Sequence, residues 1–160
     1  MSKVITQYGR AVEISVSWQE AHDGSIPLHA VKADGSCFVA RAKHNGEYIP
    51  GKLVTGHSHV FVCYDGKEIT KSHYQVLVDT SILPTTGYEW KWSEDLEIPP
   101  NAIIGGTDNG QPLFIVKSIV EGETVVGKFH PDHGCAHVPY EGLEFEKNEF
   151  EILCSLKKHL

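Results

Sequence analysis

The stretch Gly46-Glu47-Tyr48-Ile49-Pro50-Gly51-Lys52 returns 76 positions later as Gly122-Glu123-Thr124-Val125-Val126-Gly127-Lys128. The agreement runs without a gap from residue 38 to residue 78, and 12 of these 41 residues are identical to their counterparts at 114–154. Several of the other pairs are conservative exchanges, such as Arg41 with Lys117 and Asp65 with Glu141. Such self-similarity at a fixed offset indicates an internal duplication.

The match continues upstream of residue 38 at a slightly smaller offset of 72. Trp18 and the Ile26-Pro27 pair correspond to Trp90 and the Ile98-Pro99 pair. The change of offset places four extra residues in the second repeat, between Ala102 and Phe114. We therefore expect repeat one at 18–78 and repeat two at 90–154, packed about an approximate two-fold axis as one compact body of residues 1–160, because no flexible linker separates them.

Composition excludes several classes of protein. The net charge of -7 and the pI of about 5.8 argue against nucleic acid as the main partner, which demands clustered Lys and Arg. The sequence contains no run of 18 apolar residues, which would predict a membrane-spanning helix. The first ten residues lack the apolar block of a signal peptide, so we expect a cytoplasmic protein, with vesicular or unconventional export left open.

Alternation of apolar and polar residues predicts strands almost throughout. Val12, Ile14, Val16 and Trp18 alternate with polar residues, which is the period of a sheet with one wet face. Further strands are expected at 37–42, 53–55, 60–64, 74–78, 113–120, 124–129 and 150–156. Strands of this length, separated by Asn-Gly and Asp-Gly turns, predict an all-β fold of antiparallel sheets packed as a sandwich.

The four cysteines do not form a repeated framework. Cys37, Cys63, Cys135 and Cys154 include no Cys-x-x-Cys pair, and none lies opposite another cysteine in the other repeat. We expect reduced thiols that fill the core.

The ten histidines raise the question of a metal. His57 and His59 could share one face of a strand, and His130, His133 and His137 lie close together in sequence. Only His57 and His133 correspond between the repeats. We therefore expect packing or surface histidines, with no metal and no cofactor.

Three strings of the second repeat resemble a known family. They are Ile98-Pro99-Pro100-Asn101-Ala102-Ile103-Ile104-Gly105-Gly106, the Gly122–Lys128 stretch, and His133-Gly134-Cys135-Ala136-His137-Val138-Pro139-Tyr140-Glu141-Gly142. They resemble the DM-nine repeat of invertebrate proteins and of the natterin toxins. Repeat one resembles it less closely, because Ser58–Tyr64 replaces the Gly-Cys-Ala and Pro-Tyr features. If each repeat forms a binding site, we therefore expect one of the two sites to be weaker.

The resemblance implies a tandem-repeat lectin that binds mannose or mannose-rich glycans in pathogen recognition or innate immunity. It also implies no bound metal, and it leaves a homodimer open. The family's sugar-binding aspartate and lysine correspond to Asp34 and Lys52 in repeat one and to Asp108 and Lys128 in repeat two. Glu47 and Glu123, five residues before each lysine, are expected as neighbours of the sugar.

Chemistry gives a separate reason to consider these side chains. A carboxylate accepts hydrogen bonds from two adjacent sugar hydroxyls and an ammonium donates to their oxygens, while Tyr48, Tyr64 or Tyr140 could cover the apolar face of the sugar. The alternative is purely structural: a surface ion pair between the repeated Glu and Lys, and an ordinary Asp-Gly turn.

Catalysis has less support than binding. The sequence has no Gly-x-Ser-x-Gly elbow and no phosphate loop, although Asp34 and Glu47 could form the carboxylate pair of a glycosidase. Two copies of a site favour binding, because weak contacts multiply on a glycan-covered surface. We expect a non-enzyme, and the alternative function is a protein-interaction or membrane-responsive scaffold.

Overall fold

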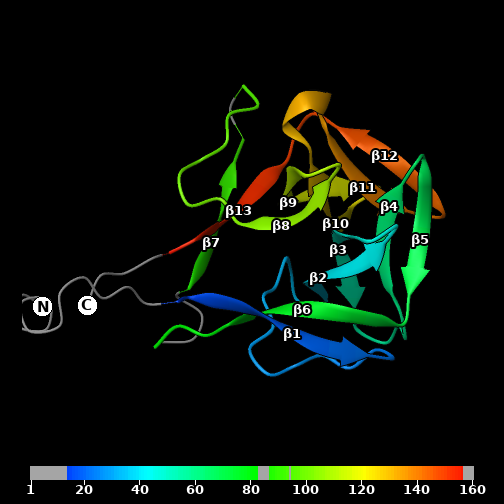
Figure 1. Cartoon of the computed structure of the whole chain (residues 1–160), viewed down its shortest axis with the longest axis vertical. Helices are drawn as coiled ribbons and strands as arrows, with labels where there is room; N and C mark the ends of the chain where they lie inside the picture. The colour runs from blue at the N-terminus through cyan, green and yellow to red at the C-terminus, as the bar shows by residue number, and fades with distance from the viewer. Residues whose placement is uncertain (1–13, 83–86, 94, 157–160) are drawn as a thin grey trace, which may run out of the picture.

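The computed structural model describes residues 14–82, 87–93 and 95–156, whose regular secondary structure consists of antiparallel strands and one short 3-10 turn (Figure 1). The prediction of an all-β fold is confirmed. Repeat one contains β1 (Val16–His22), β2 (Cys37–His44), β3 (Glu47–Val54), β4 (Val60–Tyr64), β5 (Lys67–Lys71) and β6 (His73–Asp79). Repeat two contains β7 (Tyr88–Trp92), β8 (Ile104–Asp108), β9 (Gln111–Val120), β10 (Glu123–Phe129), the short 3-10 turn η1 (Pro131–His133), β11 (Ala136–Tyr140), β12 (Leu143–Lys147) and β13 (Glu151–Ser155).

The strands of the described residues belong to one continuous hydrogen-bonded sheet. Their order is β1-β6-β2-β3-β4-β5-β12-β11-β10-β9-β13-β7, with β8 added against β9. The two halves of this order mirror each other, because each strand of repeat one has its counterpart at the same distance from the centre. The predicted sandwich thus consists of two halves of one sheet, which contact each other mainly where β3 packs against β8 and β10.

The centre of the sheet is the pairing of β5 with β12, which lie side by side in Figure 1. Lys67 pairs there with Leu143, its own counterpart in the other repeat. The N–H of Glu68 donates to the carbonyl of Gly142 at 3.0 Å, and the N–H of Glu144 donates to the carbonyl of Gly66 at 3.0 Å. Two equivalent bonds of equal length are what a pseudo-two-fold axis through this pair of strands requires.

Each repeat has its own apolar core, and a third core is shared. The repeat-one core includes Phe38, Leu53 and Tyr74, and the repeat-two core includes Phe114, Phe129 and Phe150. The shared core draws on both repeats and consists of Val31, Ala33, Cys37, Val39, Leu77, Ile115, Val126 and Leu153. Because burial of this apolar surface requires both halves, neither repeat completes its packing alone.

The repeated tryptophans flank the shared core. The Arg41 guanidinium lies 4.1 Å from the centre of the Trp18 ring, and the Lys117 ammonium lies 4.8 Å from the centre of the Trp90 ring. Both cations also reach the opposite repeat: Arg41 donates to the Gly105 carbonyl at 3.2 Å and Lys117 to the Ala33 carbonyl at 3.0 Å. These cation–π contacts hold the long side chains in place to bridge the repeats.

The strands predicted from periodicity are present, with longer bounds at β2 and β3. The first one lies further along the chain than expected, because β1 starts at Val16 and Ile14 precedes it. Val12 lies outside the described residues. Sequence reasoning missed β5, β7, β8, β11 and β12. Each of these strands is only five residues long, which leaves little room for a recognisable period of two. The four cysteines are free and buried, as predicted. Within the described ranges, no helix has the length and apolar character needed to cross a membrane.

The glycine of each repeated Gly-Lys pair lies against the backbone of the neighbouring strand. A Cβ at Gly51 would come within 2.1 Å of the Phe61 carbonyl oxygen, and one at Gly127 within 2.2 Å of the His137 carbonyl oxygen. A glycine is therefore required here because of the close approach of two backbones.

We predict that Gly51→Ala lowers the free energy of unfolding by about 2 to 3 kcal/mol, since the added methyl group must displace β4. Denaturant unfolding measures the effect. The matched control is Gly35→Ala, which meets no atom within 4 Å and has no positive φ, and should stay within about 0.5 kcal/mol of wild type. Equal stability of the two variants would contradict the close approach.

Candidate functional site

Lys52, predicted to bind a sugar, crosses from repeat one into repeat two. Its side chain is only 11% exposed, and its ammonium donates to the Pro139 carbonyl at 2.9 Å. It also forms an ion pair with Glu68, whose Oε2 lies 3.6 Å away. The other Glu68 oxygen accepts from the Gly142 N–H at 3.1 Å. Lys52 and Glu68 together therefore hold the chain that leads from β11 into β12.

Lys128 and Glu144 of repeat two make the equivalent contacts with repeat one. The Lys128 ammonium donates to the Cys63 carbonyl at 2.7 Å and lies 3.3 Å from Glu144. Glu144 accepts from the Gly66 N–H at 3.1 Å. We call the four side chains Lys52, Glu68, Lys128 and Glu144 the reciprocal clamp, because each Lys-Glu pair binds the opposite repeat.

Cleft A opens above Lys52 and has a volume of about 530 Å³. Repeat one contributes Asp34, Lys52 and His57 to its walls, and repeat two contributes Glu123 and Tyr140. The Lys52 ammonium lies 5.3 Å from the centre of the Tyr140 ring. Carboxylates from both repeats, an ammonium and aromatic rings thus line one hollow of a size suited to a small ligand.

Asp34 is held in position by the turn that precedes β2. Its Oδ1 accepts from the N–H groups of Ser36 and Cys37, both at 3.0 Å. The bond from Ser36, opposed by partial desolvation and aided by Thr124, lowers the pKa of Asp34 below its usual value of 3.8. The carboxylate is therefore ionised at neutral pH, with its orientation fixed before a ligand arrives.

Cleft B is the equivalent place in the other half, and it is nearly closed. It is lined by Asp108 and Lys128 of repeat two with Glu47 and Tyr64 of repeat one, and its volume is about 20 Å³. Such a volume holds about one water molecule.

The β8–β9 turn closes cleft B. Glu47 accepts from the N–H groups of Asn109 and Gly110, both at 3.1 Å, and from the Thr107 hydroxyl at 3.2 Å. The bonds from Gly110 and Asn109 outweigh desolvation and lower the pKa of Glu47. The four extra residues of repeat two lie in the segment that forms β8 and this turn. The inserted segment therefore supplies the donors that bind the Glu47 carboxylate.

The predicted residues come together in a different grouping from the one expected. We expected Glu47 near Asp34 and Lys52, as residues of one repeat. The structure instead places Glu123 with Asp34 and Lys52, and places Glu47 with Asp108 and Lys128. The repeats exchange their glutamates because the Glu-containing hairpin of each half faces the lysine of the other.

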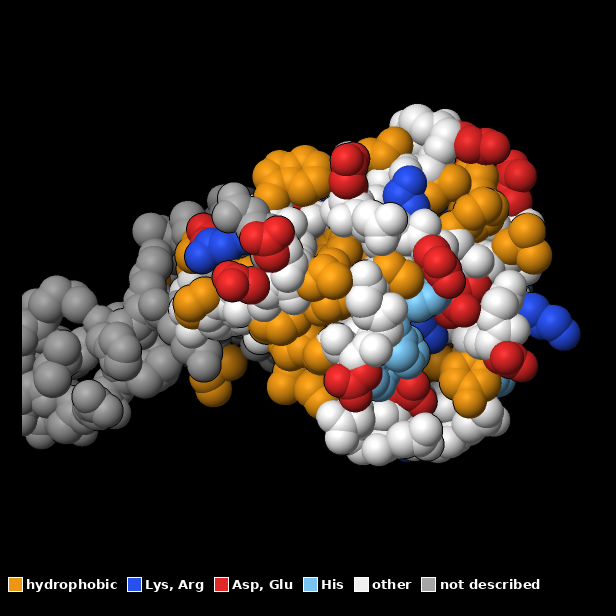
Figure 2. Space-filling view, turned by 90° about the horizontal axis from the view of Figure 1, so that it is seen from above, with side chains coloured by type: hydrophobic (Ala, Val, Ile, Leu, Met, Phe, Trp, Pro, Cys, Tyr) orange, Lys and Arg blue, Asp and Glu red, His pale blue; other side chains and the backbone are white. Residues whose placement is uncertain are grey.

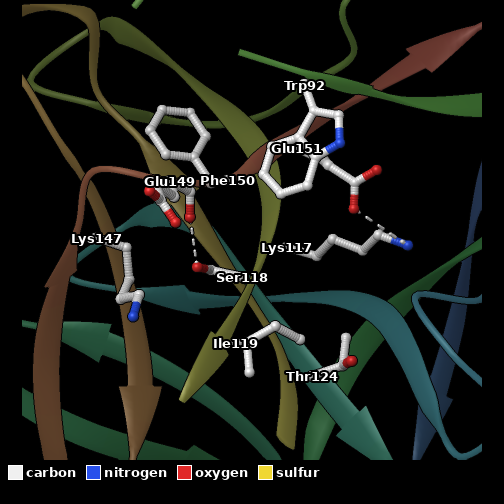
Figure 3. A pocket seen from close by; sticks show the side chains of 9 residues that line it. All are labelled: Trp92, Lys117, Ser118, Ile119, Thr124, Lys147, Glu149, Phe150 and Glu151. Atoms are coloured by element: carbon white, nitrogen blue, oxygen red, sulfur yellow. Dashed lines mark hydrogen bonds and ion pairs between the residues drawn. The ribbon is translucent and has the colours of Figure 1, made fainter. Parts of the chain in front are cut away.

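A third hollow, of about 180 Å³, was not predicted (Figure 3). Its wall includes Trp92, which is 65% exposed, Ile119 and Thr124, beside an ion pair of 3.7 Å between Lys117 and Glu151. Figure 3 shows the Trp92 ring above this ion pair.

Repeat one fills the place that corresponds to this third hollow. Tyr48 stands at the position of Thr124 and stacks 4.2 Å from the Arg41 guanidinium, and Glu20 stands at the position of Trp92. Gln75 joins Arg41 to Glu20 through hydrogen bonds of 2.8 and 2.6 Å. Comparison of the two repeats at these positions is the sequence signal that would have found the hollow.

The clamp predicts a large effect of removing one charge. Lys128→Met should lower the free energy of unfolding by about 3 kcal/mol, since it leaves Glu144 buried without its counter-ion. Lys128→Met with Glu144→Gln should recover part of the loss. Lys67→Met, at an exposed lysine of β5, is the matched control and should change the free energy of unfolding little. Chemical unfolding that gives equal values for Lys128→Met and Lys67→Met would rule out the clamp.

The clamp also predicts sensitivity to acid. Burial raises the pKa of Glu144, but the combined effect of Lys128, the Gly66 N–H and Cys63 is larger and of opposite sign. The pKa of Glu144 therefore lies below its usual 4.5. The folded state thus binds fewer protons than the unfolded chain, and this stabilisation is present above about pH 4.5 and is lost as the pH falls through the folded pKa. Unfolding followed between pH 6 and pH 3 should show a shallower loss for Glu144→Gln. An unchanged slope would contradict this assignment.

Comparison with known proteins relates this chain to a family of repeats and to a solved fold. A family model described as the DM9 repeat matches residues 32–147. Natterin-4 of Thalassophryne nattereri is 29% identical over 138 residues, which cover 82% of this chain and 32% of natterin-4. The chain thus spans about a third of the length of this relative. The crystal structure of the nematode sperm cell motility protein MFP2B shares the fold, with a TM-score of 0.63 and 20% identity over 88% of this chain and 44% of that one. The extent of the family match establishes that this chain belongs to the DM9 repeat family.

Proposed function

We propose that this protein binds mannose or mannose-rich glycans in cleft A, as a lectin without catalytic activity. The observation that supports the proposal best is the wall of cleft A, where carboxylates from both repeats face an ammonium and an aromatic ring. Vicinal hydroxyls of a hexose donate to a carboxylate and accept from an ammonium, and such charge-assisted bonds are the stronger kind. The Tyr140 ring offers a surface for the apolar face of the sugar.

Lys52 can serve the clamp and a ligand together. An ammonium has three N–H donors, and one of them bonds to the Pro139 carbonyl. The contact with Glu68 at 3.6 Å is an ion pair that is too long for a good hydrogen bond. A sugar hydroxyl that accepts from this ammonium would add a partner without displacing the clamp.

The proposal gives each chain one working site. Cleft B has almost no free volume, and the carboxylate of Glu47 already binds three donors of the β8–β9 turn. A single monosaccharide contact is weak, with a Kd on the order of millimolar. Recognition of a microbial mannan, the setting we propose for this lectin, would then require several chains on one surface.

We expect calorimetry with mannose and mannobiose to register one site per chain. Glu123→Gln and Asp34→Asn should each weaken binding roughly tenfold or more, since each removes a charge from a hydrogen bond to the ligand. Asp108→Asn, the same change in cleft B, is the matched control and should bind as wild type.

Absence of heat with both sugars, from folded protein, would overturn the proposal. Loss of binding in Asp108→Asn with retention in Asp34→Asn would place the site in cleft B instead.

A second candidate function is a protein-interaction scaffold, favoured by the exposed Trp92 beside the third hollow. A glycan array separates the two functions. Signal on terminal mannose that survives Trp92→Ala supports the lectin, and a blank array with folded protein favours the scaffold.

A further inference from the structure

The histidines of repeat two gather around η1. The rings of His130 and His133 are stacked with their centres 4.0 Å apart, and His137 meets His133 edge-on at 5.7 Å. Figure 2 looks down on this end of the molecule and shows histidine side chains gathered among acidic ones. Two groups of three side chains there have their ligand atoms within 4.8 Å of one another: Asp108, His130 and His133, and Cys135, His137 and Glu146.

The group around His130 is poorly arranged for a cation. Nδ1 of His130 accepts from the Asp132 N–H at 3.1 Å, so the neutral ring carries its proton on Nε2. That Nε2 lies 3.8 Å from Asp108 and has no lone pair to offer a metal. The His130 and His133 rings are also nearly parallel, at 8°, so their in-plane lone pairs do not converge.

The group around His137 is arranged differently. Cys135 directly precedes β11, two residues before His137, and Glu146 lies directly opposite His137 on β12, so the three side chains gather on one face of the hairpin. Nε2 of His137 lies 3.9 Å from the Cys135 sulfur and 3.9 Å from a Glu146 oxygen. Neighbouring ligands of a tetrahedral zinc ion stand about 3.3 to 3.8 Å apart, as its bond lengths require.

His137 also lacks good hydrogen bonds. Its Nδ1 is buried and has no hydrogen-bond partner among the described residues. Both contacts of Nε2 are longer than an N–H···O bond. A cation on Nε2 would give this nitrogen the strong partner that the protein does not supply.

We propose that Cys135, His137 and Glu146 bind one Zn²⁺ ion. A thiolate, an imidazole and a carboxylate are the ligands that zinc takes in proteins, and sulfur disfavours the hard cations Mg²⁺ and Ca²⁺. Binding removes the proton of the Cys135 thiol, which passes to the solvent. Glu146 is 77% exposed, so water can take the fourth position. The proposal differs from the expectation of no metal and is independent of glycan binding in cleft A.

Repeat one provides an internal comparison. His59, Phe61 and Thr70 stand at the positions of Cys135, His137 and Glu146. Phe61 offers no ligand atom, so a repeated structural site is excluded, and the zinc site belongs to repeat two alone.

Full-length protein, stripped with a chelator, should take up one Zn²⁺ per chain in calorimetry at neutral pH, with release of a proton. Co²⁺ in its place should give the near-ultraviolet charge-transfer band of a thiolate ligand. Cys135→Ser should abolish this band, and Glu146→Gln, at an exposed side chain that folding does not need, should weaken Zn²⁺ binding roughly tenfold or more.

The double variant His57→Ala, His59→Ala removes two histidines of repeat one and should bind Zn²⁺ as wild type. Absence of stoichiometric Zn²⁺ binding would overturn the proposal. So would affinity that is unchanged in Glu146→Gln, or binding that is lost in His130→Ala but retained in Cys135→Ser.

Discussion

The reciprocal clamp of Lys52, Glu68, Lys128 and Glu144 is the constraint on which the rest of the structure depends. Each pair is buried, and each ammonium finds its strongest hydrogen bond on a carbonyl of the opposite repeat. A buried charge without a partner is costly, so a repeat that folded alone would leave these groups unsatisfied. The clamp therefore couples the two repeats at the centre of the sheet, where β5 pairs with β12.

The geometry of the clefts follows from this coupling. Because each lysine crosses the boundary, the hollow above it is lined by both repeats, and the duplication produces two related clefts at one interface. The four extra residues of repeat two then distinguish them, since the β8–β9 turn binds Glu47 and fills cleft B, while cleft A keeps Glu123 facing an open volume.

Away from the clamp, the repeats have diverged. Trp92 and Thr124 open a hollow where repeat one has the Arg41–Gln75–Glu20 network, and Cys135, His137 and Glu146 gather where repeat one has Phe61 and Thr70. These positions lie at the surface or at the rim of the core, where a change of side chain costs little stability. The four clamp residues are identical in both halves, and so are Gly51 and Gly127, where the close approach of the neighbouring backbone leaves no room for a side chain.

Local periodicity and residues that recur at a fixed offset are enough to predict the duplication, the all-β class and eight of the thirteen described strands. The sequence also identifies Asp34, Lys52 and their counterparts as unusual repeated polar groups. The sequence does not show which glutamate faces which lysine, since two similar repeats are consistent with either grouping until the chain is folded. The fold alone reveals that the glutamates are exchanged, that Lys52 and Lys128 lie largely buried in the clamp, and that cleft B is closed. Each of these outcomes depends on contacts between residues more than 50 positions apart, and no local pattern encodes them.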